Sequence, residues 1–122
     1  LNARMSEGLY RTSKERREDP TLEFLYRSAG PVWYRGMVCT DEKYDPLTPE
    51  QTDALLRRYD ADRLLVGHTI FPDISTFHDG RVIAVNVQNE LNRRKTRGRA
   101  VLIEGSRISV VGNRGVKRVL EE

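Results

Sequence analysis

A short apolar run that ends in a glycine and a histidine constrains the fold of this chain more than any other stretch. Residues 64–66 are consecutive apolar residues without helical spacing, which predicts a buried strand. Gly67 follows, and glycine allows a sharp turn or a close approach to a ligand. His68 is therefore expected at the carboxyl end of a strand, where the ligand sites of α/β sheets gather.

Other segments predict helices and further strands. Thr48 followed by proline, and then by Gln51, is typical of a capping box at the start of a helix. A shorter helix is expected after Thr21, which can serve as its cap. Apolar runs at 82–87, 100–104 and 107–111 predict strands that share one sheet with residues 64–66. The glycine-containing turns near the end predict an antiparallel β-meander, so the fold class is α/β or α+β.

Composition limits the size of the core. The chain has 122 residues, of which 38% are hydrophobic and 32% are charged. One domain is expected at this length, with a small core. Cys39 is the single cysteine, which excludes a disulfide within the chain. No run approaches the 18 to 20 apolar residues of a membrane span, so we expect no membrane partner.

Three blocks together resemble the carboxyl-terminal half of a calcineurin-like metallophosphatase, in the branch of bacterial serine/threonine phosphatases. They are residues 30–36, the Gly-His-Thr that follows residues 64–66, and residues 82–87. The resemblance implies half of a metallophosphoesterase-type β-sandwich flanked by helices. It covers residues 30–122 as part of a phosphoesterase domain, whereas residues 1–29 are expected to be a polar, partly helical lead-in.

The resemblance also shows which metal-binding motifs of the family this sequence lacks. The two-metal centre of that family depends mainly on Asp-x-His, Gly-Asp-x-x-Asp and Gly-Asn-His-Glu motifs, and this sequence has none of them. We therefore expect a fragment of a parent enzyme that holds two divalent ions (Mn, Fe or Zn). The fragment alone should be inactive, bind metal weakly at most, and associate with the missing amino-terminal half or with itself.

The resemblance assigns two residues to the chemistry of the parent enzyme. His68 would be a ligand for one metal ion. Arg35, which follows a Trp-Tyr pair, would bind the phosphate of a phosphorylated substrate, because a guanidinium offers forked donors to two phosphoryl oxygens. His78 lies at a predicted turn, and we expect it to be solvated rather than a ligand.

A second function remains open. Residues 93–99 contain five cations in seven positions, and the sequence pI is about 9.2. Such a run can neutralise nucleic-acid phosphates or contact an acidic protein. It contains no aromatic residue for stacking on bases, which favours a solvated loop over a nucleic-acid site. The alternative to a phosphomonoester hydrolase is therefore a small basic binding module.

Overall fold

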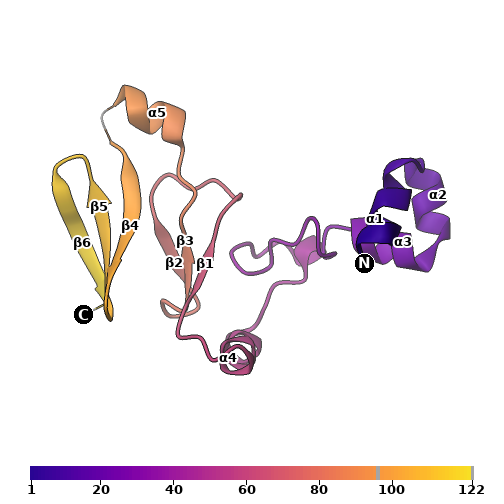
Figure 1. The fold of residues 1–122 in the computed structure, drawn as a ribbon, viewed down its shortest axis with the longest axis horizontal. Helices are drawn as coiled ribbons and strands as arrows, with labels where there is room; N and C mark the ends of the chain where they lie inside the picture. The colour runs from indigo at the N-terminus through magenta and orange to yellow at the C-terminus, as the bar shows by residue number, and fades with distance from the viewer. Residues whose placement is uncertain (96, 122) are drawn as a thin grey trace. The chain divides into compact units, whose positions relative to one another are not determined.

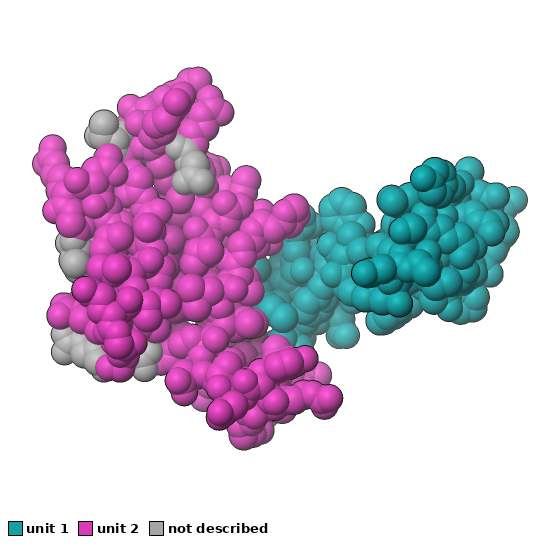
Figure 2. All heavy atoms as spheres, in the orientation of Figure 1, with its two compact units in different colours: residues 1–47 teal, residues 48–122 magenta. Residues whose placement is uncertain are grey.

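The computed structural model describes residues 1–95 and 97–121, and the chain forms two compact units. Unit 1 comprises residues 1–47 and unit 2 comprises residues 48–122 (Figure 2). The predicted division into a lead-in and a phosphoesterase domain at residues 29 and 30 stays a prediction.

Unit 1 contains three short helices and one turn of 3₁₀ helix. They are α1 (Asn2–Leu9), α2 (Ser13–Glu18), α3 (Pro20–Tyr26) and η1 (Glu42–Tyr44) (Figure 1). Leu22 and Leu25 of α3 are 1% and 2% exposed and provide the small core of this unit. Gly8 allows α1 to lie close to α3, because a Cβ at this position would come within 2.4 Å of the Tyr26 ring.

Asp19 starts α3 and also links it to α1. Its carboxylate accepts hydrogen bonds from the backbone N–H groups of Thr21 and Leu22, at 2.9 and 3.1 Å. Arg4 of α1 donates to the same carboxylate and, as the largest cause, lowers the pKa of Asp19 below its ordinary value. The prediction that Thr21 caps this helix is wrong, because Asp19 is the N-cap and Pro20 the first residue of the helix.

Unit 2 consists of two helices and two three-stranded sheets. Helix α4 (Pro49–Arg58) begins with the predicted capping box, since Thr48 accepts from the Gln51 backbone and the Gln51 side chain accepts from the Thr48 backbone. The first sheet has the order β1-β3-β2, and the second has the order β4-β5-β6 (Figure 1). The remaining elements are β1 (Leu64–Val66), β2 (Ser75–Phe77), β3 (Val82–Ala84), α5 (Asn89–Arg94), β4 (Arg99–Glu104), β5 (Arg107–Gly112) and β6 (Gly115–Glu121).

Strand β3 is the centre of the first sheet. It pairs in parallel with β1 and antiparallel with β2, and all three of its residues are buried. The two sheets share one apolar cluster. Its buried members are Ile74, Ile83, Val87, Ile108 and Val110.

The mixed α and β composition is confirmed, but the predicted arrangement of the strands is wrong. Residues 64–66 and 82–84 lie in one sheet, whereas the meander of β4 to β6 forms a second sheet. Strand β3 pairs with β1 and β2, whereas β4 pairs with β5, its neighbour in sequence, through a two-residue turn. The strands therefore show a mixed α and β fold with two small sheets, and they do not show the predicted half of a metallophosphoesterase β-sandwich.

Several large apolar side chains of unit 2 are exposed, a pattern that favours association with another surface. Self-association nevertheless stays a prediction. No helix in the described part of the chain is long and apolar enough to cross a membrane. The exposed apolar residues of unit 2 are Tyr59, Leu65, Ile70, Leu91, Leu102 and Ile103.

Candidate functional site

Arg35 lies in an aromatic and basic cluster of unit 1. Its side chain is half-buried, and its Nη1 donates a 2.9 Å hydrogen bond to the Tyr44 hydroxyl. The guanidinium carbon lies 5.5 Å from the centre of the Tyr44 ring and 5.9 Å from the Trp33 ring. Cation–π contact of this kind holds a guanidinium in place without neutralising it. The charge of Arg35 is therefore held beside two aromatic rings.

A second cation completes this group, which we call the Arg35 cluster and define as Trp33, Arg35, Lys43 and Tyr44. The Lys43 ammonium lies 5.0 Å from the centre of the Tyr44 ring and 2.8 Å from Asp41. The hydrogen bond from Lys43 lowers the pKa of Asp41, and the same bond raises the pKa of Lys43. Arg35 and Lys43 thus flank one tyrosine. Because Asp41 offsets the charge of Lys43, Arg35 is the member of the cluster whose chemistry suits an anion such as phosphate.

Backbone hydrogen bonds fold residues 30–47 back on themselves to form the cluster. The N–H of Leu47 donates to the carbonyl of Gly36 at 3.0 Å, and the Tyr34 hydroxyl donates to the carbonyl of Asp45 at 3.0 Å. Gly36 has no room for a side chain, because a Cβ would come within 2.6 Å of the Asp45 carbonyl oxygen. Lys43 and Tyr44 were not predicted as neighbours of Arg35, although aromatic residues spaced on both sides of an arginine are a recognisable signal.

His68 lies where the sequence predicted it, immediately beyond the carboxyl end of β1. The neighbouring strand β3 runs parallel to β1, so the segments that follow the two strands lie side by side. The Asn86 side chain donates a 3.1 Å hydrogen bond to the His68 carbonyl, and Asn86 accepts one from the Phe71 N–H at 3.0 Å. The His68 side chain is exposed.

The backbone of His68 is unusual for a residue with a side chain. Its φ is +70°, in the left-handed region that favours glycine. A non-glycine residue there costs roughly 1 to 2 kcal/mol. Asp45, Asp60, His78 and Asp79 have positive φ as well, so this backbone conformation does not by itself assign a function to His68.

The first prediction separates a functional role from a structural one at this position. His68→Gly is expected to leave the free energy of unfolding unchanged or to raise it by up to about 1 kcal/mol, because glycine adopts this φ without strain. Urea denaturation followed by circular dichroism measures the change. His68→Ala, which keeps the strain, is the control, and a large loss of stability in the glycine variant would show that the imidazole holds the fold.

A metal centre does not fit the described residues. No group of three or more His, Cys, Asp or Glu side chains that could hold an ion occurs among residues 1–95 and 97–121. His68 would therefore supply a single imidazole, which is fewer ligands than metal sites in proteins use. Metal binding at His68 stays a prediction, and no chemical step is derived from it.

His78 lies in the predicted turn, between β2 and β3. Three consecutive residues, His78, Asp79 and Gly80, have φ values of +51°, +54° and +85°. The His78 carbonyl accepts a 3.1 Å hydrogen bond from the N–H of Arg81, which closes the turn. The His78 side chain is half-buried rather than fully solvated.

Two of the cations in the basic run at residues 93–99 form ion pairs with nearby carboxylates. Arg94 in helix α5 lies 2.8 Å from Glu90. Arg99 at the start of β4 is 18% exposed at its side chain and lies 3.3 Å from Asp73. The predicted loop is partly a helix, and Thr96 lies outside the described residues. No observation therefore favours the basic binding module.

Comparison with known proteins identifies the fold through solved structures. No family model and no curated protein matches the chain. It is similar to a cold-active protein tyrosine phosphatase, with a TM-score of 0.64 and 25% identity over 88% of this chain. A structure of the cold-active enzyme from the psychrophile Shewanella sp. gives a TM-score of 0.64 and 26% identity over 89%. The structural neighbours are phosphatases.

The chain spans about 30% of the length of these neighbours. Their names correct the resemblance drawn from the sequence: the matched structures are named protein tyrosine phosphatases, not calcineurin-like metallophosphatases. The phosphatase character suggested by the sequence is retained, and its metal dependence is not supported.

Proposed function

We propose that the protein carrying this chain is a phosphatase that hydrolyses phosphomonoesters, with aryl phosphates such as phosphotyrosine as the first substrates to test. The observation that carries the proposal is the fold. A TM-score of 0.64 over 88% of the chain, together with 25% identity, relates it to structures named for this activity. Aryl phosphates are chosen as the first substrates because those neighbours are named protein tyrosine phosphatases.

The Arg35 cluster supports the phosphate-binding part of the proposal. In the resting structure the Arg35 guanidinium is held by the Tyr44 hydroxyl and by two aromatic rings, so it loses little conformational freedom when an anion binds. A fork of N–H donors can contact two phosphoryl oxygens at once. Lys43 lies on the same ring, where its ion pair with Asp41 offsets its charge. Arg35 would thus bind the substrate phosphate and offset the charge on its oxygens as the ester bond breaks.

The experiment compares a monoester with a diester on the full-length protein. We expect hydrolysis of p-nitrophenyl phosphate and of a phosphotyrosine peptide, and no hydrolysis of bis(p-nitrophenyl) phosphate. The diester is the matched control, since it has the same leaving group and differs only in the second ester bond. Release of p-nitrophenol from the diester alone, or from neither compound, would overturn the proposal.

A further inference from the structure

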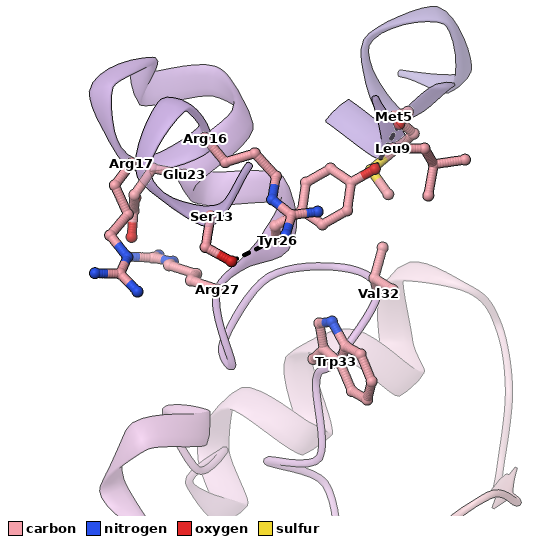
Figure 3. Close-up of a pocket in the computed structure, with 10 residues that line it drawn as sticks. All are labelled: Met5, Leu9, Ser13, Arg16, Arg17, Glu23, Tyr26, Arg27, Val32 and Trp33. Atoms are coloured by element: carbon pink, nitrogen blue, oxygen red, sulfur yellow. Dashed lines mark hydrogen bonds between the residues drawn. The ribbon is translucent and has the colours of Figure 1, made fainter. Parts of the chain in front are cut away.

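A pocket of about 580 Å³ opens on the surface of unit 1, and it shares Trp33 with the Arg35 cluster. Its volume lies within the range of about 300 to 1,000 Å³ that is typical of ligand sites. Helices α1, α2 and α3 and the segment after α3 all contribute to its walls (Figure 3). The lining residues are Met5, Leu9, Ser13, Arg16, Arg17, Glu23, Tyr26, Arg27, Val32 and Trp33.

One side of the pocket is apolar and solvent-exposed. Leu9, Val32 and Trp33 are 71%, 51% and 48% exposed, which is high for residues of this type. Figure 3 shows Met5, Leu9 and Val32 on one side of the pocket, with the Trp33 ring below them. Exposed apolar side chains that line a recess indicate a surface that another molecule covers.

The other side of the pocket is cationic. Arg16 is committed to the fold, because it donates to the Gly8 carbonyl and stacks at 4.6 Å on the Tyr26 ring. Arg17 and Arg27 lie on the side of the pocket opposite Met5 and Leu9 (Figure 3). Arg27 stacks at 5.2 Å on the Phe24 ring, a contact that leaves its charge in place, and neither arginine forms an ion pair within residues 1–95 and 97–121. Against three arginines the pocket walls contain one acidic residue, Glu23.

This excess of positive charge is local. Residues 1–47 contain eight Lys or Arg and eight Asp or Glu, so unit 1 has no net charge as a whole. Two of the acidic residues, Glu7 and Asp19, are paired with arginines of α1 and the adjoining turn. The pocket is therefore a positively charged recess in a neutral unit, and its charge selects an anionic ligand.

We infer that this pocket binds an acidic peptide segment carrying one large apolar side chain. Carboxylates of the peptide would pair with Arg17 and Arg27, while the apolar side chain packs against Trp33 and Val32. A recess fits a protruding side chain, whereas a flat lipid surface would reach only its rim. In the proposed phosphatase the pocket would hold a protein substrate beside the Arg35 cluster, because Trp33 belongs to both. Its role as a substrate site therefore rests on the proposed function, while peptide binding itself does not.

The test uses an unphosphorylated probe, so that it is independent of catalysis. A fluorescein-labelled Asp-Glu-Asp-Glu-Phe-Leu peptide is titrated with the protein, and binding is measured by anisotropy. Trp33 is the single tryptophan of this chain, so a change in intrinsic fluorescence with unlabelled peptide reports on the wall that the pocket shares with the Arg35 cluster. The Arg17 and Arg27 variants then assign the binding to the pocket. Arg17→Gln combined with Arg27→Gln should weaken binding about tenfold at low salt, and added salt should weaken it for the unaltered protein.

Matched controls make the result specific. Lys14→Gln removes an exposed cation of the same helix that does not line the pocket, and it should leave the affinity unchanged. A Lys-Arg-Lys-Arg-Phe-Leu peptide should not bind, and replacement of Phe-Leu by Ser-Ser should weaken binding of the acidic peptide at least tenfold. Absence of peptide binding, equal loss in the Lys14 variant, or a Trp33 response to anionic phosphatidylserine vesicles without one to peptide would overturn the inference. If the unaltered full-length protein binds the acidic peptide but hydrolyses no phosphomonoester, only the proposed function is refuted.

Discussion

Ile83→Ala is expected to lower the free energy of unfolding of unit 2 by about 2 to 5 kcal/mol, the usual cost of truncating a buried isoleucine. Ile83 is 1% exposed, lies in the central strand β3 and belongs to the cluster that both sheets share. The cavity would therefore weaken the packing of each sheet on the other. Urea denaturation monitored by far-ultraviolet circular dichroism measures the effect.

Ile103→Ala is the matched control for this substitution. Ile103 lies in β4 and is 52% exposed, so the same truncation removes few buried contacts. Its effect on the free energy of unfolding should stay within about 0.5 kcal/mol. Equal losses for the two variants would mean that the core of unit 2 is not formed around β3.

Arg35→Ala is expected to reduce kcat/KM of the full-length protein for p-nitrophenyl phosphate about ten- to a hundredfold. This range corresponds to the loss of one charge-assisted contact to phosphate, roughly 1.5 to 3 kcal/mol. The Tyr44 hydroxyl and the Trp33 ring would keep their own positions in the chain, so the loss should come from the missing guanidinium. Steady-state kinetics and inhibition by inorganic phosphate measure it.

Two further variants identify the cause of such a loss. Arg35→Lys keeps the charge but not the fork of donors, so it should recover only part of the activity. Arg58→Ala removes an exposed arginine at the end of α4 and should leave the rate unchanged. If Arg35→Ala keeps full activity and full phosphate inhibition, then Arg35 does not bind the phosphate.

Local sequence signals predicted the elements well where short-range chemistry determines them. The capping box at Thr48 and Gln51 is formed as expected, and the turn at Gly105 joins two antiparallel strands. Gly105 has a φ of +63°, which explains why a glycine is found there. Residues 64–66 form the predicted strand, with His68 just beyond it.

The pairing of strands could not be predicted in the same way, because it depends on contacts between distant residues. Strand β2 was missed since Ser75–Phe77 has only three residues and little apolar character, yet it occupies one edge of β3. The meander of β4, β5 and β6 forms a sheet of its own. The left-handed backbone at His68 and the partnership of Arg35 with Tyr44 are likewise products of the folded chain.

The order of strands in unit 2 has a consequence for the speed of folding. Strands β4, β5 and β6 pair only with their neighbours in sequence, through turns of two residues. Strand β1 instead pairs in parallel with β3. Before these two strands can pair, the chain between them must form a loop that brings β3 back alongside β1. Closing a long loop costs more entropy than forming a hairpin, and pairings between distant segments are slow. The meander is therefore the part of the chain suited to form first, and the edge that positions His68 is the part that is completed last.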